Sequence, residues 1–349
     1  MKDDIKVIMI GPGSEEKGGI ATVIKNFKRY FNCSNVSITY LTSWKDGNWF
    51  NKNIVFVKCC KNLIQEIKKN KKSIIHVHFA QKGSFYRKSI LSLFSKKDDK
   101  LVFHMHASQF DMFYKNSNLL QKKYISWVLD RADIVVALSK EWANFYTEIT
   151  NSKVEIIPNA VVIPEKNYYS SSSTNILTFG KVGNRKGSFD ILKVAKLLQY
   201  NYPKFSFILY GDGELEKVRK IIDKEDIKNV TIGGWISDKE SLLKDAAVHF
   251  LPSYHEGLPM AVLETMAAGI PNICSKVGGI PQVVNSMTGV LIEPGNIEQM
   301  KDVLIKTLLS CEKREMMSKN ARQLIKNSFS IDKYHNDWIR IYHHLVDIE

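Results

Sequence analysis

The sequence contains few cysteines and no long apolar run. Its cysteines are an odd number and too sparse for a disulfide framework, and no two have the spacing of metal ligands: Cys33, Cys59, Cys60, Cys274 and Cys311. No stretch approaches the roughly 18 consecutive apolar residues that a membrane-spanning helix needs, and the first residues do not resemble a signal peptide. These absences argue against a disulfide-stabilised secreted protein and predict a protein of the reducing cytoplasm.

The standard phosphate-binding and metal-binding motifs are also missing. After Gly11 and Gly13, the third glycine of a dinucleotide fingerprint is replaced by Glu16, and a P-loop would need Lys after Gly18, where Gly19 stands. No Asp-x-Asp sequence occurs, so neither a diphosphate-bridging metal ion nor any other cofactor is expected. What remains is the Gly18-Gly19 pair, whose backbone can approach a phosphate closely at the start of the following helix.

Length and charge indicate two domains with different surfaces. The 349 residues are about twice the typical length of one domain, and 44% apolar residues suffice for two cores. Residues 1–163 contain 26 Lys and Arg against 14 Asp and Glu, a net charge of +12, whereas the rest of the chain contains 24 against 22, a net charge of +2. The basic excess indicates an anionic partner, either nucleic acid or a lipid surface, or a lysine-rich surface that only aids solubility.

Short apolar runs alternate with helical patterns along the chain. In the first half we expect strands at residues 5–10, 36–41, 54–57, 74–78, 101–104, 134–138 and 154–157. After a proline- and serine-rich connection we expect strands at residues 176–179, 205–210, 230–232, 248–251 and 272–274. The pattern predicts an α/β protein with two doubly wound domains that face each other across a cleft. They comprise residues 1–163 and 164–332, and the last helical stretch, 333–349, can pack back on the first domain.

The strongest local signal is the segment HEGLPMAVLETMAAGIP at residues 255–271. A proline and a glycine frame one short helix at about residues 259–268, and the loop ahead of it would present backbone N–H groups to a phosphate. Glu256 precedes this helix and Glu264 lies inside it. Each carboxylate alone could be a capping or solvated residue, but two of them in an otherwise apolar segment favour a binding site.

A cluster of cations follows the strand expected at residues 176–179. Lys181, Arg185 and Lys186 lie within six residues of one another. At the carboxyl end of a parallel strand they can neutralise a diphosphate without a metal ion. The alternative is that they are ordinary surface charges on a loop.

The histidines gather at the ends of two expected strands, in the sequences HVH and HMH. Alternate positions on a strand share a face, so a metal site is conceivable there, but no carboxylate or cysteine completes it. We therefore interpret His76, His78 and His104 as residues of the core or of a cleft wall. His106 follows its strand directly.

Taken in order, these segments resemble the retaining nucleotide-sugar glycosyltransferases of family 4, which have the GT-B fold of two Rossmann-like domains. The resemblance implies transfer of a hexose or N-acetylhexosamine, with retention, from a nucleotide diphosphate sugar such as a UDP-sugar. The implied acceptor is a saccharide or lipid-linked saccharide used in cell-surface polysaccharide synthesis. It also implies a metal-independent, cytoplasmic enzyme that can associate with the inner face of the plasma membrane.

The same resemblance assigns roles to individual residues. It implies catalytic roles for Glu256, His106 and Lys186, and ribose binding by Glu264. The residues implied at the diphosphate are Gly18, Gly19, Lys181, Lys186, Leu258, Pro259 and Met260. Those implied at the transferred sugar are His106, Glu256, Gly257 and Leu258. At position 181 many family members have arginine, which would grip a phosphate with two hydrogen bonds where lysine cannot.

Other functions remain open from the sequence. A nucleotide-sugar epimerase or a sugar phosphorylase could use the same architecture, and the basic first half could belong to a nucleic-acid-binding protein, although no named nucleic-acid motif is present. Within that half, residues 82–97 combine aromatic and aliphatic positions with cations at both ends. This composition suits either a helix at an anionic lipid surface or the buried face of an ordinary helix.

Overall fold

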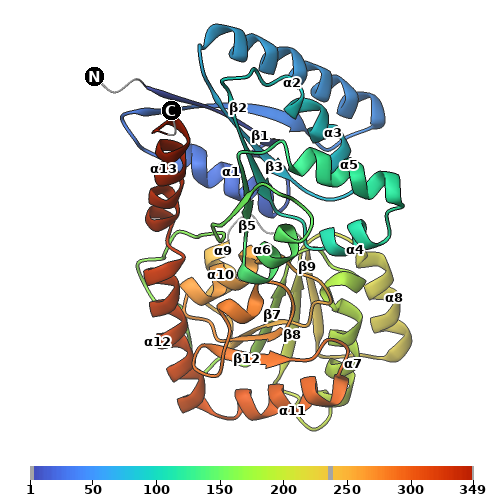
Figure 1. Ribbon diagram of the computed structural model, residues 1–349. Coiled ribbons are helices and arrows are strands. Elements are labelled where there is room, and N and C mark those ends of the chain that lie inside the picture. The colour runs from blue at the N-terminus through green and yellow to red at the C-terminus, as the bar shows by residue number, and fades with distance from the viewer. Residues whose placement is uncertain (1–3, 235–238, 348–349) are drawn as a thin grey trace. The chain divides into compact units, whose positions relative to one another are not determined.

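The chain forms two compact units in the computed structural model, which describes residues 4–234 and 239–347 (Figure 1). Unit 1 contains the chain up to Asn159 together with the segment from Ile331 onward, and unit 2 contains Ala160–Ser330. The sequence placed the first boundary after residue 163 and the second after residue 332. The last helix is therefore part of unit 1, although the whole of unit 2 separates it from that unit in the sequence.

Unit 1 contains a six-stranded parallel sheet in the order β2-β1-β3-β4-β5-β6. Its strands are β1 (Ile5–Pro12), β2 (Val36–Trp44), β3 (Ile74–Phe79), β4 (Lys100–Met105), β5 (Ile134–Ala137) and β6 (Lys153–Ile156). Its helices are α1 (Gly19–Tyr30), α2 (Trp49–Lys69), α3 (Gly83–Ser92), α4 (Phe110–Lys115), α5 (Leu119–Leu129), α6 (Lys140–Thr147) and α13 (Ile331–Asp347). Every residue of β3 and β5 is buried, as expected for central strands covered on both faces.

Unit 2 contains a second six-stranded parallel sheet, in the order β12-β11-β10-β7-β8-β9. Its strands are β7 (Asn175–Phe179), β8 (Ser206–Tyr210), β9 (Val230–Gly234), β10 (Val248–Leu251), β11 (Asn272–Ser275) and β12 (Gly289–Ile292). Its helices are α7 (Ser188–Leu198), α8 (Leu215–Glu225), α9 (Lys239–Leu243), α10 (Met260–Ala267), α11 (Ile297–Leu308) and α12 (Cys311–Ser328), with the short 3₁₀ helices η1 (Asn184–Lys186) and η2 (Ile280–Gln282).

The strand order of unit 2 reverses between β7 and β10. In an open parallel sheet, the loops that leave the carboxyl ends of the two strands at such a reversal diverge and leave a crevice, where ligands bind. The prediction of two Rossmann-like α/β domains is confirmed. Among the described residues, no helix combines the length and the apolar character needed to cross a membrane.

Two local predictions about strands differ from the structure. Residues 54–57, predicted as a strand, belong to helix α2, and β12 was not predicted. The run Ile-Val-Phe-Val reads as a strand because all four side chains are apolar, which hides the helical period. In α2, however, these side chains point to different sides: Phe56 packs on the core of unit 1, whereas Ile54 and Val57 are exposed.

Helix α13 closes one side of the unit 1 core with aromatic side chains. Trp338 and Tyr342 are fully buried, and the Trp338 ring lies 4.3 Å from the His76 ring, centroid to centroid. The Tyr342 hydroxyl is 2.7 Å from Nδ1 of His76, and Trp338 also packs against Phe27 of α1. These contacts explain why the C-terminal helix belongs to the first unit.

Four histidines form a stacked column at the ends of β3 and β4. His76 stacks on His78 with ring centroids 4.6 Å apart and an interplanar angle of 13°. His76 Nε2 is 3.3 Å from Nδ1 of His104, and His78 Nδ1 is 2.9 Å from Nε2 of His106. One ring nitrogen from each of His76, His78 and His104 lies within 4.8 Å of the others, and all three side chains are buried. The column is a hydrogen-bonded core element, as the sequence predicted for His76, His78 and His104.

Burial makes this column sensitive to acid. It lowers the pKa of His76, His78 and His104 well below the usual value, and it lowers the pKa of His106 to about 3. The folded histidines are therefore neutral at pH 7, and the unfolded chain binds more protons once the pH falls below about 6.5. The contribution of these neutral histidines to the free energy of unfolding is fully present above that pH and is lost progressively below it.

We expect the free energy of unfolding to fall between pH 7.5 and pH 5.5, by up to about 1.4 kcal/mol per pH unit for each buried histidine below its unfolded pKa. Urea unfolding followed by tryptophan fluorescence measures this, because five of the six tryptophans lie in unit 1. The variant His344→Gln removes an exposed histidine of α13 and should keep the same slope. Equal stability at the two pH values would contradict the assignment of neutral buried histidines.

Candidate active site

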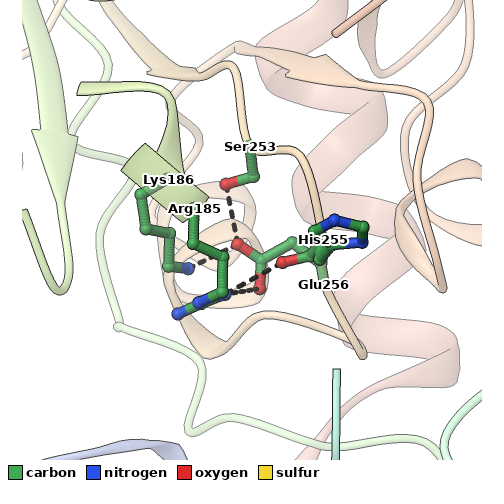
Figure 2. Close-up of polar contacts among 5 residues, drawn as sticks. All are labelled: Arg185, Lys186, Ser253, His255 and Glu256. Carbon is green, nitrogen blue, oxygen red and sulfur yellow. Dashed lines mark hydrogen bonds and ion pairs between the residues drawn. The ribbon is translucent and has the colours of Figure 1, made fainter. Parts of the chain in front are cut away.

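The candidate site of unit 2 centres on the carboxylate of Glu256, in the loop that follows β10. Figure 2 shows this carboxylate facing two cations from η1, which follows β7. Lys186 Nζ lies 2.5 Å from Oε1 of Glu256, and Arg185 Nη1 lies 3.6 Å from its Oε2. Because η1 follows β7 and the Glu256 loop follows β10, the ion pairs join the two loops at the point where the strand order reverses.

Glu256 is only 5% exposed, yet it stays ionised. Burial by itself raises the pKa of Glu256, but the charges of Lys186 and Arg185 outweigh it, together with hydrogen bonds from Lys186 and Ser253, and hold this pKa below its usual range. Ser253 Oγ donates to Oε1 at 2.7 Å. Both carboxylate oxygens are therefore engaged by positive or donating groups.

Backbone and side-chain contacts tie the two loops together. Tyr254 N–H donates to the Arg185 carbonyl at 2.8 Å. Figure 2 shows the second contact, in which Arg185 Nη1 donates to the His255 carbonyl at 2.9 Å. The Tyr254 hydroxyl donates to Asp190 of α7 at 2.7 Å. The loops approach so closely at Gly187 that a Cβ there would lie 2.1 Å from the Pro252 carbonyl oxygen. The geometry of the cations around Glu256 thus depends on the absence of a side chain at position 187.

A third loop supports the Glu256 segment from the next strand, β11. Gly279 N–H donates to the Gly257 carbonyl at 2.6 Å. Gly278 has φ of +54°, and a Cβ there would lie 2.0 Å from the carbonyl oxygen of Glu256. Only glycine fits this conformation and this approach. The Gly-Gly-Ile-Pro sequence at residues 278–281 therefore supports the backbone of the candidate site.

Helix α10 begins directly after the Glu256 loop. Pro259 is its N-cap, and the helix spans Met260–Ala267, one residue shorter at each end than predicted. A buried hydrogen-bond network anchors it to the sheet: the Thr265 hydroxyl and His249 Nδ1 both contact Oδ1 of Asn272, at 3.1 and 2.6 Å. The N–H groups of Met260 and Ala261 precede the first hydrogen bond of the helix, which Val262 N–H donates to the Pro259 carbonyl at 3.1 Å, and the positive dipole end lies next to the Gly257 backbone.

Glu264 is the one residue of α10 that is not buried. It lies four residues after Met260, so it shares a face with the helix start and lies about 6 Å further along the axis. A ligand that places a phosphate at the helix start can therefore reach the Glu264 carboxylate with its next group.

The other residues of unit 2 that were implied at the site differ in their burial. Gly257, Leu258, Pro259 and Met260 are buried at the start of α10. Lys181 is exposed, and the ion pairs of Glu256 that the structure describes are those to Lys186 and Arg185.

Three residues implied at the site belong to unit 1. Gly18 is the N-cap of α1 with φ of +124°, and Gly19 is its first residue. His106 follows the last residue of β4, and its N–H donates to the Phe79 carbonyl at 2.9 Å. All three lie after the carboxyl ends of their strands, which is the ligand-binding edge of a parallel sheet.

The sequence did not include Arg185 or Ser253 among the assigned site residues. Arg185 was noted as one of three clustered cations that can neutralise a diphosphate, but the family resemblance gave it no role of its own. Ser253 carried a weaker signal, since it stands three residues before Glu256 and two after the end of β10. Only the approach of the two loops shows that these side chains share one carboxylate.

Two family models match the chain. The model described as "Glycosyl transferases group 1" matches residues 163–324, and the model described as "Glycosyltransferase Family 4" matches residues 17–163. The first match therefore contains the Glu256 site, and the second contains His106 and the Gly18-Gly19 pair.

A curated relative is the UDP-Gal:alpha-D-GlcNAc-diphosphoundecaprenol alpha-1,3-galactosyltransferase of Escherichia coli. It is 31% identical over 200 residues, which cover 52% of this chain and 51% of the relative. The chain thus spans about half the length of that relative.

Solved structures show the same fold over nearly the whole chain. Sucrose-phosphate synthase from Thermosynechococcus elongatus matches with a TM-score of 0.81 at 18% identity, over 99% of this chain and 100% of that one. HepE from Anabaena, in complex with UDP, matches with a TM-score of 0.77 at 14% identity, over 97% of this chain and 100% of that one. At these identities the likeness establishes the fold alone.

The support from the β11 loop predicts a stability difference between two glycine variants. Gly278→Ala and Gly234→Ala both place alanine at positive φ, with a strain of about 1–2 kcal/mol. Only the Cβ at 278 meets the Glu256 backbone, whereas the Cβ at 234 meets no atom of the described residues within 4 Å. Urea unfolding followed by circular dichroism should show the larger loss of stability for Gly278→Ala, and equal losses would contradict the close approach.

Proposed function

Because the chain belongs to the family 4 glycosyltransferases with the GT-B fold, we propose that it transfers a sugar from a nucleotide diphosphate sugar to a saccharide acceptor, with retention of the anomeric configuration. The observation that carries this proposal is the cluster of Arg185, Lys186 and Glu256 at the strand-order reversal of unit 2, immediately ahead of helix α10. This is the crevice in which an open α/β sheet binds nucleotides.

The charge of the cluster suits a diphosphate. Two cations and one carboxylate leave a net charge of +1 in a largely buried setting, and the start of α10 adds the positive end of a helix dipole. A cation about 4 Å from a phosphate charge contributes roughly 4 kcal/mol of attraction at an effective dielectric of 20. This attraction grows as the leaving diphosphate gains charge, so it favours bond breaking without a metal ion.

The spacing within α10 suits the rest of a nucleotide. With the diphosphate at the helix start, the attached ribose is the next group along the ligand, and Glu264 offers a carboxylate about 6 Å further on. We therefore assign Glu264 to the ribose hydroxyls. We assign the amides of Gly257, Leu258 and Met260 to the phosphates and the transferred sugar. Lys181, an exposed residue of the loop after β7, would attract the diphosphate from a longer distance.

The bonding of Glu256 favours an electrostatic role over a nucleophilic one. Its Oε1 accepts hydrogen bonds from Lys186 and Ser253, and its Oε2 is paired with Arg185. Such a carboxylate has little tendency to attack carbon, because attack would sacrifice these interactions. It can instead orient Lys186 and contact the sugar hydroxyls.

We propose same-face substitution as the mechanism. The bond from the anomeric carbon to the diphosphate breaks, the bond to the acceptor oxygen forms on the same face, and a leaving phosphate oxygen accepts the acceptor's proton. His106, whose pKa burial lowers to about 3, would act as a neutral hydrogen-bonding group near the sugar rather than as a cation. The Gly18-Gly19 backbone would approach the phosphates.

The names of similar proteins support a UDP-linked donor and a lipid-linked acceptor. The Escherichia coli relative is named for a UDP-galactose donor and a diphosphoundecaprenol acceptor, and HepE was solved with UDP and with UDP-glucose. We accordingly propose a hexose or N-acetylhexosamine donor and an acceptor used in cell-surface polysaccharide or glycolipid synthesis.

A transfer assay tests the proposed reaction. The purified chain, incubated in EDTA with a panel of UDP-sugars and polyprenyl-diphosphate-linked saccharides, should release UDP only when an acceptor is present. UDP release without acceptor would instead indicate an epimerase, and a requirement for inorganic phosphate would indicate a phosphorylase. Loss of activity in EDTA that Mg²⁺ or Mn²⁺ restores would contradict charge neutralisation by Arg185 and Lys186. If oligonucleotides raise the melting temperature of the chain and none of the UDP-sugars does, the result would favour nucleic-acid binding.

Substitutions of Glu264 and Glu256 should affect different quantities, namely UDP affinity and kcat. Glu264→Ala removes a charged hydrogen-bond partner of the ribose, so UDP affinity should fall about 10- to 100-fold with kcat nearly unchanged. Glu256→Gln leaves the cations without their carboxylate at the reacting centre, so kcat should fall on the order of 100-fold in a folded protein.

Steady-state kinetics and calorimetric titration with UDP separate these two effects. Glu312→Gln, which changes an exposed carboxylate of α12, is the matched control and should behave like the unmodified chain. Near-normal kinetics in both Glu256→Gln and Glu264→Ala would remove the Glu256 cluster from the proposed mechanism.

A further inference from the structure

Helix α2 exposes a row of large apolar side chains that the core of unit 1 does not use. The exposed fractions of Trp49, Phe50, Ile54 and Val57 are 71%, 68%, 65% and 66%. Phe50, Ile54 and Val57 follow the spacing of one helix face, and a shallow groove runs along that face. Figure 1 shows α2 on the outer side of unit 1.

The opposite face of α2 is a normal core face. Cys59, Leu63 and Ile67 are buried, and Phe56 packs against the same cluster. The helix is therefore apolar on two sides. The inner face accounts for its attachment to the sheet, and the outer face remains unexplained by the fold.

Lysines surround the outer apolar row. The helix contains five lysines and one acid, Glu66. Lys58 and Lys61 are exposed and line the same groove as Phe50, Ile54 and Val57, and Lys68 and Lys69 follow at the end of the helix. Long lysine side chains can keep their charges at a polar boundary while their stems lie along apolar surface.

We propose that this outer face, defined here as the α2 face (Trp49, Phe50, Ile54, Val57, Lys58 and Lys61), docks on an anionic lipid bilayer. Trp49 and Phe50 enter the interfacial region together with Ile54 and Val57, and the lysines contact anionic head groups. A helix of 21 residues extends about 31 Å, long enough to lie along the surface rather than touch it at one point. The net charge of +12 over residues 1–163 adds long-range attraction to the same surface.

Charge favours a lipid surface over a second copy of the chain. In a two-fold contact, the same face meets itself, so the lysines of both copies would approach one another with one glutamate on each helix to offset them. An anionic bilayer instead satisfies both the apolar row and the lysines. This inference is independent of the proposed transfer reaction.

Residues 82–97, for which the sequence left a lipid-binding helix and an ordinary buried helix equally open, pack within the fold. Phe85, Lys88 and Leu91 of α3 are buried, and Lys88 Nζ donates to the His78 carbonyl at 2.5 Å. Lys96 Nζ donates to the Ile67 and Asn70 carbonyls. The alternative stated above, an ordinary helix with a buried face, therefore describes α3, and the exposed apolar row lies on α2.

Flotation with lipid vesicles tests the proposal on the full chain. We expect binding to phosphatidylcholine vesicles that contain phosphatidylglycerol, weaker binding at high salt, and little binding to pure phosphatidylcholine. The variant with Phe50→Ser, Ile54→Ser and Val57→Ser should lower the partition coefficient at least about tenfold. The variant with Lys58→Gln and Lys61→Gln should lower it about 30-fold.

Matched controls change exposed residues of the same kinds in unit 2. Tyr200→Ser with Leu309→Ser removes exposed apolar side chains, and Lys224→Gln with Lys326→Gln removes exposed lysines. Both controls should bind vesicles like the unmodified chain. Near-ultraviolet circular dichroism verifies that every variant keeps its fold.

Trp49 provides a direct probe of insertion. Brominated lipids quench only tryptophans that enter the bilayer, so the unmodified chain should lose part of its fluorescence on anionic brominated vesicles. Trp49→Phe should abolish this quenchable part while vesicle binding persists. Quenching that survives in Trp49→Phe would assign insertion to another segment and overturn the proposal.

Two further results would overturn it. One is equal flotation of the unmodified chain and both α2 variants. The other is a dimer in sedimentation velocity that the apolar variant converts to monomer, combined with no flotation of the unmodified chain on anionic vesicles. That second result would identify the α2 face as a contact between copies.

Discussion

A carboxylate remains ionised inside a protein only if positive or hydrogen-donating groups compensate for its lost hydration. Glu256 meets this constraint with Lys186, Arg185 and Ser253, and much of unit 2 is arranged to allow it. The compensation requires the loops after β7 and β10 to touch, and that contact requires a glycine at position 187. The loop after β11 supports the same segment through Gly278, so loops from three strands converge on one buried charge.

The buried histidines of unit 1 are neutral, whereas the buried carboxylate of Glu256 in unit 2 is charged. The histidine column has no carboxylate partner among the contacts that the structure describes, and its rings remain neutral and bond to one another and to Tyr342. The column therefore holds β3, β4 and the C-terminal helix together without a net charge. The two units thus present different electrostatics at their sheet edges: a neutral imidazole at His106 in one, and an ion-paired cluster in the other.

Helix α2 shows how one element can serve the core and a surface at once. Its inner stripe packs on the sheet, so the helix would form whether or not anything covered the outer stripe. The outer apolar row is therefore not required for folding, and exposing it to water is unfavourable. A feature that folding does not need and solvent does not favour is best explained by a partner surface.

Much of this arrangement follows from local patterns in the sequence. The alternation of buried runs and helices indicates two parallel α/β units, because strands covered on both faces must be almost wholly apolar. The segment from Glu256 to Glu264 likewise indicates a loop and a helix start with a carboxylate on each side, since those positions depend only on neighbouring residues.

The partners of Glu256 could not be found in this way. Lys186 and Glu256 are 70 residues apart, and only the adjacency of β7 and β10 in the sheet brings their loops together. The same limit explains why Ser253 was not assigned to the site, and why residues 54–57 were predicted as a strand. The side of an apolar run that faces the core is decided by the element that packs against it. The order of apolar residues along the chain does not identify that element.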